Sequence, residues 1–127
     1  MEQYLIDNNV IANFTAEKFS ENTMIFLANV IDEIPNISII TKIEALSWRS
    51  HIPQDEFFVK SFVQNSNIIA LSDMIIDKCI EIRRNGKVKT PDAIIAATAI
   101  VYDLTLLTSD LGFRRIPNLK IINPFDL

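Results

Sequence analysis

A nearly all-apolar helix is predicted to begin near Thr90, and it limits what the chain can fold into. No charged residue lies between Asp92 and Asp103. Thr90 suits the N-cap, because its hydroxyl can accept a hydrogen bond from the first helical turn, and Pro91 suits the first helical position. A helix that is apolar nearly all round is a buried helix. The small residues that let another backbone approach it are Ala96, Ala97 and Ala99.

Apolar runs of strand length alternate with helical patterns along the chain. We expect strands at residues 3–7, 37–40, 67–71, 104–108 and 119–122. We expect the other helices at residues 10–14, after Ser20 or Asn22, from Thr41, from Pro53, and from Ser72 to Arg84. The helix expected from Thr41 fits a capping box, in which the Glu44 side chain bonds back to the start of the helix. Continuous apolar strands that alternate with helices predict an α/β fold with a parallel sheet covered on both faces.

Length and composition predict one domain over residues 1–127, with 49% apolar residues and a net charge of −4. A domain of this size buries a substantial core. The start, Met1-Glu2-Gln3, does not resemble a signal peptide, and no apolar run approaches membrane-spanning length. We therefore expect a cytoplasmic protein that does not bind a membrane. The single Cys79 is expected to be a buried, inert thiol.

Positive charge is concentrated in residues 78–120, which contain eight basic and four acidic residues. A group within this segment, Arg83, Arg84, Lys87 and Lys89, precedes Asp92 closely enough to guide a phosphate backbone toward it. A solvated helix end is an equally open interpretation. The dipole of the preceding helix favours Arg83 and Arg84 at its carboxyl end without any ligand.

Acidic residues recur where the predicted strands end. Asp7 ends the first strand, Glu44 follows the second, Asp110 follows the fourth, and Asp92 opens the helix before the fourth. Ligands of parallel sheets bind outside the carboxyl ends of the strands. Each acid has a local explanation as a cap or turn residue, but together they would repel one another without a cation. Nearby uncharged donors are Asn9, Thr108 and Ser109.

Carboxylate oxygens of this kind suit Mg²⁺ or Mn²⁺, and the matching chemistry is phosphodiester hydrolysis. No competing site is evident in the sequence. His51 is the only histidine and is expected at the surface, and there is no zinc-binding pattern or glycine-rich phosphate loop. A phosphoacceptor receiver domain is excluded, because the acceptor Asp after the third strand and the late Lys are replaced by Leu71-Ser72 and Thr108-Ser109.

Four segments resemble the signature of PIN-domain nucleases, and the short chain resembles the VapC-type toxins of type II toxin–antitoxin systems. The segments are Leu5 to Val10, Glu44 after the second strand, Thr90 to Ala99, and Thr108 to Asp110 with Phe113. The resemblance covers almost the whole chain, and the segment around Asp92 is its most specific part. The chain departs from the family pattern at Asn8, where Thr or Ser is commoner, and at Gly112, which is often acidic in relatives.

The resemblance implies a PIN-like three-layer sandwich with strand order 3-2-1-4-5. It also implies that Asp7, Glu44, Asp92 and Asp110 are catalytic and hold Mg²⁺ or Mn²⁺, with Asn9 and Thr108 supporting them. The implied activity is a metal-dependent endoribonuclease, and the implied partners are RNA, a cognate antitoxin and a second copy in a homodimer. Two alternatives stay open at this point. One is an RNA-processing PIN nuclease outside a toxin system, and the other is a non-catalytic module that binds RNA or protein.

Overall fold

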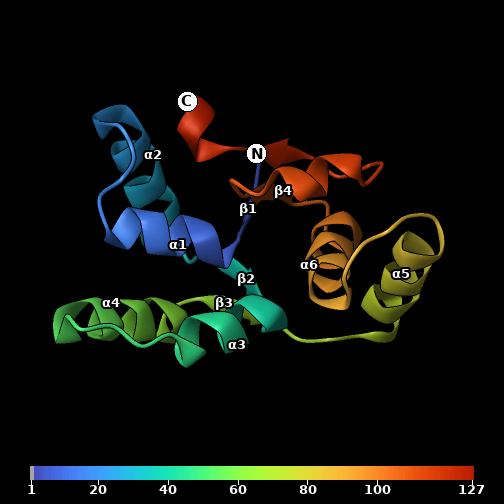
Figure 1. The fold of residues 1–127 in the computed structure, drawn as a ribbon, viewed down its shortest axis with the longest axis horizontal. Helices are drawn as coiled ribbons and strands as arrows, with labels where there is room; N and C mark the ends of the chain where they lie inside the picture. The colour runs from blue at the N-terminus through green and yellow to red at the C-terminus, as the bar shows by residue number, and fades with distance from the viewer. Residues whose placement is uncertain (1) are drawn as a thin grey trace.

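The computed structural model describes residues 2–127, which form a five-stranded parallel sheet with helices on both faces (Figure 1). The strand order is β3-β2-β1-β4-β5, which confirms the predicted fold class and strand order. The strands are β1 (Tyr4–Ile6), β2 (Asn36–Ser38), β3 (Asn67–Ile69), β4 (Thr105–Leu107) and β5 (Ile121–Ile122). The helices are α1 (Asn8–Thr15), α2 (Glu21–Asp32), α3 (Ile39–Ser47), α4 (Pro53–Gln64), α5 (Asp73–Arg84) and α6 (Thr90–Val101), with short 3₁₀ turns at Leu111–Arg115 and Pro124–Asp126.

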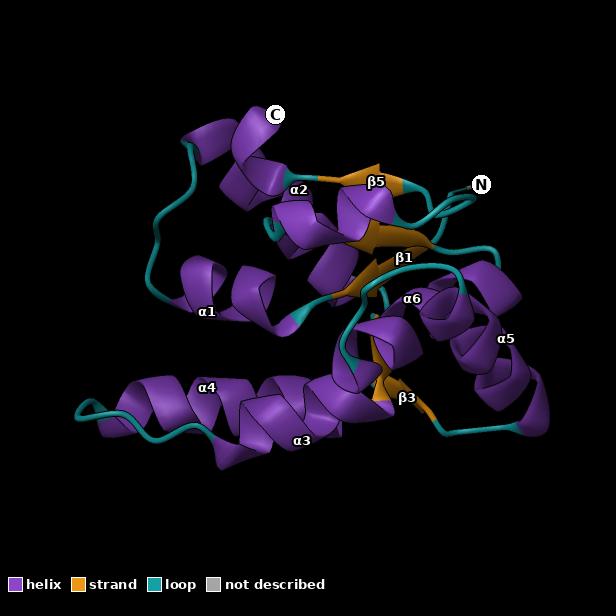
Figure 2. Cartoon of the chain, turned by 45° about the vertical axis from the view of Figure 1, so that its right-hand side comes forward, coloured by secondary structure: helices purple, strands orange, loops and turns teal. Residues whose placement is uncertain are grey.

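The two central strands lie fully inside the protein. Leu5 of β1 pairs with Leu106 of β4, and neither side chain is accessible to solvent. One hydrophobic core lies between the sheet and the α5–α6 hairpin, and it includes Leu5 and Leu106. The other lies under α1, α2 and α4, and it includes Ile6 and Leu107. Successive strand residues therefore enter opposite cores, which explains why the strands are apolar throughout instead of alternating with polar residues. Figure 2 shows the helices on both sides of the sheet.

Helix α6 is buried as predicted, but it begins at Thr90, one residue earlier than the predicted start at Pro91. Its buried residues are Ala93, Ile95, Ala96, Ala97, Thr98 and Ala99. Lys89 is the N-cap, and no side chain makes a capping hydrogen bond. The prediction of Thr90 as the cap and Pro91 as the first helical residue was wrong, because the Ala93 N–H already bonds to the Lys89 carbonyl. Thr90 and Pro91 are therefore the first and second helical residues.

Helix α3 also begins earlier than predicted. Strand β2 ends at Ser38, and Ile39 and Ile40, predicted as strand, form the first turn of the helix. The Ser38 hydroxyl caps this helix by accepting a hydrogen bond from the Thr41 N–H at 3.0 Å. The predicted capping box from Thr41 to Glu44 was therefore wrong, because Thr41 lies inside the helix. Glu44 lies in the second turn of α3 and has no capping role.

Other helix ends follow the sequence signals. Ser20 caps α2 and Ser72 caps α5 through their hydroxyl groups, and Pro53 begins α4. The predicted helix at residues 10–14 extends over residues 8–15, and the strands are shorter than predicted by one to two residues at one or both ends. Within the described part of the chain, no helix has the length and apolar character that crossing a membrane requires.

Candidate active site

The four predicted acids come from four separate elements near the carboxyl edge of the sheet. Asp7 is the N-cap of α1 directly after β1, and Glu44 lies in α3 after β2. Asp92 is the third residue of α6. Asp110 follows β4 and caps a 3₁₀ turn by accepting a hydrogen bond from the Gly112 N–H at 2.8 Å. Parallel strands therefore deliver Asp7 and Asp110 to the same side of the sheet, as the fold rule predicts.

Asp7 is the buried member of this group, and hydrogen bonds hold both of its carboxylate oxygens. Its side chain is only 6% exposed. Oδ1 accepts the Asn8 N–H at 2.8 Å. Oδ2 accepts the Thr108 hydroxyl at 2.7 Å and the Asn9 amide Nδ2 at 3.0 Å. These bonds fix the orientation of the carboxylate, and all three donors stabilise its ionised form.

Thr108 connects Asp7 to Asp110 through a single hydroxyl. Besides donating to Asp7, the Thr108 oxygen accepts the backbone N–H of Asp110 at 3.1 Å and the Asn9 amide at 3.2 Å. Asn9 is held in turn, because its Oδ1 accepts the Ser109 N–H at 3.2 Å. The predicted supporting residues Asn9, Thr108 and Ser109 thus lie around Asp7. Ser109 contributes its backbone amide to this network.

The acids lie close enough together to act on one another electrostatically. Burial raises the pKa of Asp7 despite its hydrogen bonds, and the charges of Asp92 and Asp110 raise that pKa further. Burial likewise raises the pKa of Glu44, with contributions from Asp7 and Asp92. The pKa of Asp92 is raised by burial and by Asp110. The carboxylates of Asp7, Asp92 and Asp110 therefore each destabilise the ionised form of at least one other acid, which is the pattern of an uncompensated negative site.

Lys89 is a neighbour of the acids that was not placed at the site itself from sequence. Its positive charge lowers the pKa of Asp92, opposing the effects of burial and Asp110. Its position three residues before Asp92, at the N-cap of α6, was the available signal. Gly112 was likewise not recognised as a donor to Asp110, because a backbone amide leaves no signal in residue type.

The donor chemistry of the acids bears on the metal that the family resemblance implies. Across residues 2–127, no three His, Cys, Asp or Glu side chains form a group arranged to hold a metal ion. The acids are thus electrostatic neighbours without a closed coordination shell. Their donors are all carboxylate oxygens, which suit a hard divalent cation. The raised pKa values of Asp7, Glu44 and Asp92, which a nearby cation would counteract, fit the same ion.

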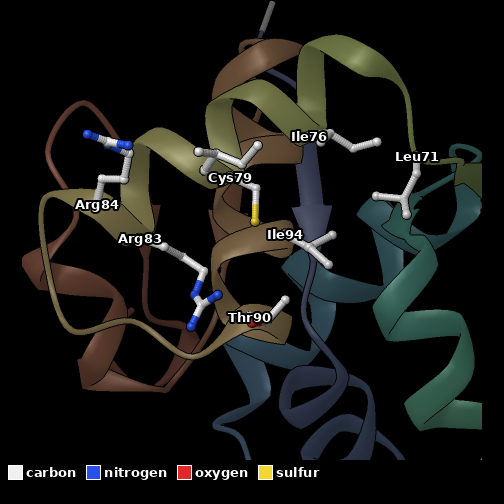
Figure 3. A pocket seen from close by; sticks show the side chains of 8 residues that line it. Leu71, Ile76, Cys79, Arg83, Arg84, Thr90 and Ile94 are labelled. Atoms are coloured by element: carbon white, nitrogen blue, oxygen red, sulfur yellow. The ribbon is translucent and has the colours of Figure 1, made fainter.

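The other reactive side chains lie outside this group. His51 is exposed on the loop before α4, as predicted. Cys79 is buried, and burial raises the pKa of its thiol, which agrees with the prediction of an inert residue. Cys79 borders an open, mostly apolar cavity of about 500 Å³ between α5 and α6 (Figure 3). None of the four acids lines this cavity.

The fold and site define a parallel α/β domain with mutually interacting carboxylates at the carboxyl edge of its sheet. The model of the PIN domain family matches residues 4–119. The chain therefore belongs to the PIN domain family, whose members are nucleases that hydrolyse phosphodiester bonds. No curated protein sequence matches the chain significantly.

Several solved structures of similar fold are toxin–antitoxin complexes. A chain of DNA-bound VapBC from Salmonella typhimurium is 22% identical, with a TM-score of 0.79 and coverage of 98% of this chain and 99% of that one. A chain of VapBC2 from Rickettsia felis, bound to a DNA fragment from its promoter, is 22% identical, with a TM-score of 0.76 and coverages of 94% and 97%. A chain of a toxin–antitoxin complex from Klebsiella pneumoniae is 25% identical, with a TM-score of 0.73 and coverages of 98% and 100%.

Proposed function

We propose that this PIN-domain nuclease is a metal-dependent endoribonuclease and the toxin of a VapBC-type toxin–antitoxin pair. The observation that carries the proposal is the charge coupling among the acids. Asp92 and Asp110 both raise the pKa of the buried Asp7, and Asp7 and Asp92 raise that of Glu44. Burying the Asp7 carboxylate beside other carboxylates is costly unless a cation compensates the charge, so binding of Mg²⁺ or Mn²⁺ would explain the cluster.

Asp7, Glu44, Asp92 and Asp110 are the residues that would hold this cation. When bound, it would supply an activated water and neutralise charge that develops on the phosphate. The protein's own contribution is to position and ionise these ligands. Thr108 and Asn9 donate to Asp7 Oδ2, and the Asn8 N–H donates to Oδ1, so the carboxylate is oriented before any ligand arrives. Lys89 favours the ionised form of Asp92, which a metal ligand requires.

The toxin assignment is supported by the similar structures. Chains that cover nearly all of this one come from VapBC and other toxin–antitoxin complexes. We infer that this chain also binds a small antitoxin and forms a homodimer. Expression of the chain in a bacterial host should arrest growth, and co-expression of the product of a small adjacent gene should relieve the arrest. Light scattering of the purified chain should give the mass of a dimer.

The nuclease proposal is tested by single-residue substitutions assayed on RNA. Asp7→Asn or Asp92→Asn should abolish Mn²⁺-dependent cleavage of single-stranded RNA while the circular dichroism spectrum stays unchanged. The same change at Asp77, an exposed aspartate of α5, should leave the rate unaltered. If Asp92→Asn cut RNA as fast as the parent, the site assignment would be wrong. RNA binding that survives EDTA, with no cleavage in any metal, would instead favour a non-catalytic module.

A further inference from the structure

The α5–α6 hairpin contains positive charges that no acidic residue neutralises. Within residues 78–120, Lys78, Arg114 and Lys120 form ion pairs with Glu81, Asp126 and Asp103. The remaining basic residues of this segment form no ion pair with any described residue: Arg83, Arg84, Lys87, Lys89 and Arg115. In a chain with a net charge of −4, four of these five cations, all but Arg115, fall within residues 83–89, shortly before Asp92.

Arg83 and Lys89 are two cations that lie at the amino end of α6. The Arg83 Nε donates a hydrogen bond to the Val88 carbonyl at 3.3 Å, which ties its side chain to the loop just before Lys89. Figure 3 shows its guanidinium beside Thr90, whereas the neighbouring Arg84 points away from Thr90. Lys89 caps α6 and lies close enough to Asp92 to lower the pKa of that carboxyl. We name Arg83 and Lys89 together the basic strip.

Helix electrostatics explains only part of this arrangement. Arg83 and Arg84 lie in the last turn of α5, where the negative end of the helix dipole favours them. Lys89 lies at the opposite kind of terminus, because the amino end of α6 is positive and disfavours a cation. The helix also has no capping hydrogen bond from Lys89 or another side chain. The position of Lys89 therefore opposes the preference of the helix dipole. The negative charge of Asp92 and the neighbouring acids explains it.

We propose that the basic strip binds the phosphate backbone of the RNA and guides it to the acids around Asp92. This inference rests on the proposed function, because it assigns a substrate-binding surface to the same site. The guanidinium of Arg83 offers paired N–H donors to phosphate oxygens, and Lys89 supplies a mobile point charge nearer the acids. A polyanion that approaches a negative site requires such cations, because the acids alone would repel it.

The test measures binding and cleavage separately on matched variants. Binding of a short fluorescein-labelled single-stranded RNA is followed by anisotropy in EDTA, over a series of salt concentrations, for the parent chain, R83Q/K89Q and R84Q/K60Q. The control pair removes the same charge. Arg84 is the exposed neighbour on the same helix end, and Lys60 is exposed on α4 over the other core. Cleavage of the same RNA is measured in Mn²⁺, and thermal melts check that both variants fold.

We expect R83Q/K89Q to raise the RNA dissociation constant about tenfold at low salt. The magnitude of its log–log salt slope should fall by about 1.4, since each phosphate that a protein neutralises on a single strand contributes about 0.7 to that slope. R84Q/K60Q should change the dissociation constant less than about twofold. Equal weakening of RNA binding in the two double variants, an unchanged R83Q/K89Q, or no measurable RNA binding by the parent would overturn the inference. A parent that binds RNA through the strip but cleaves none would contradict the proposed function alone.

Discussion

The hydroxyl of Thr108 donates a 2.7 Å hydrogen bond to Oδ2 of Asp7, although 101 residues separate the two in the sequence. Both side chains are buried, and they follow β1 and β4, which pair at Ile6 and Leu107. The same Thr108 oxygen accepts the N–H of Asp110. One hydroxyl therefore fixes the positions of two acids from different strands relative to each other.

Replacing Thr108 with valine removes this link with little change in shape. We expect Thr108→Val to lower the free energy of unfolding by about 1–3 kcal/mol, because it removes one donor from the buried Asp7 carboxylate and the acceptor of the Asp110 N–H. RNA cleavage should fall at least about tenfold, because Asp7 and Asp110 lose their common anchor. Chemical denaturation and initial rates in Mn²⁺ measure the two effects.

The matched control for this change is Thr98→Val in α6. Thr98 is equally buried, but its hydroxyl bonds only to the Ile94 carbonyl of its own helix. This variant should retain the parent cleavage rate. If Thr98→Val and Thr108→Val lost activity in proportion to their loss of stability, Thr108 would have only a structural role.

The raised pKa values of the acids predict how stability depends on pH without metal. In the folded state the pKa values of Asp7 and Asp92 lie above their ordinary value of 3.8, and that of Glu44 lies above 4.5. The folded state therefore holds these protons more tightly than the unfolded state. The stabilisation is complete below the ordinary pKa values and is lost as pH rises through the folded ones. In EDTA, the melting temperature should therefore be highest near the ordinary pKa values of these acids and should fall as the pH rises through their folded pKa values.

Asp92→Asn should flatten this pH dependence by removing one of the coupled carboxylates. Asp77→Asn, on an exposed face of α5, should leave it as steep as in the parent. Two exposed acids act in the opposite direction, since Thr105 lowers the pKa of Glu2 and Lys120 lowers that of Asp103. A melting temperature in EDTA that rose as the pH was raised from these ordinary pKa values to neutrality would contradict the mutual repulsion assigned to the acids.

Binding of a divalent cation should offset the electrostatic repulsion among the acids. At about 100 times its dissociation constant, Mn²⁺ should stabilise the parent chain by about 2.7 kcal/mol, because it binds the folded state alone. Glu44→Gln and Asp92→Asn should reduce this gain, and Asp77→Asn should not. Thermal melts with and without Mn²⁺ measure the difference. An equal gain in all of these proteins would place the ion elsewhere on the chain.

Gly112 is predicted to control the position of the Asp110 carboxylate. A Cβ added at Gly112 would lie 3.1 Å from Asp110 Oδ1, so the carboxylate would have to move by a few tenths of an ångström. We therefore expect Gly112→Ala to weaken cleavage several-fold with little loss of stability. At Gly86, by contrast, an added Cβ meets its nearest atoms at 3.9 Å, which is ordinary contact. Gly86→Ala should keep the parent activity. Comparing the RNA cleavage rates of the two variants tests whether Gly112 controls the position of the Asp110 carboxylate.

Much of the fold followed from pattern alone, because apolar strands and amphipathic helices have distinct periods. The strand order was implied by the PIN-domain resemblance and is confirmed. The helix starts capped by Ser20 and Ser72 were predicted correctly, whereas the start capped by Ser38 was not. The predicted helix starts were wrong at α6, where a backbone hydrogen bond to Lys89 sets the first turn, and at α3, which begins where β2 ends. Ile39 and Ile40 are apolar in either a strand or a buried helix turn, and only the end of β2 at Ser38 separates the two.

The candidate site was predictable in residue type and only partly in geometry. The acids at strand ends and the resemblance at Asp92 identified which residues to consider. The long-range bonds of Thr108 depend on how β1 and β4 pair, which no local spacing contains. The metal assignment and the roles of the acids stay predictions that the experiments above test. The interpretation of Asp92 also changes in one respect. Because Thr90 does not cap α6, Asp92 lies at a helix end without a side-chain cap, and its helix-dipole role stands beside its proposed metal role.

The burial of α6 on nearly all sides has a consequence for evolution and for engineering. Ala99 is fully buried, so we expect a larger side chain there to clash with its neighbours and to shift the helix. Ala99 lies seven residues from Asp92, or about 10 Å at 1.5 Å per residue. A genetic screen for inactive variants of this nuclease should therefore recover substitutions at both ends of α6. Those at the far end would inactivate the enzyme without touching any acid.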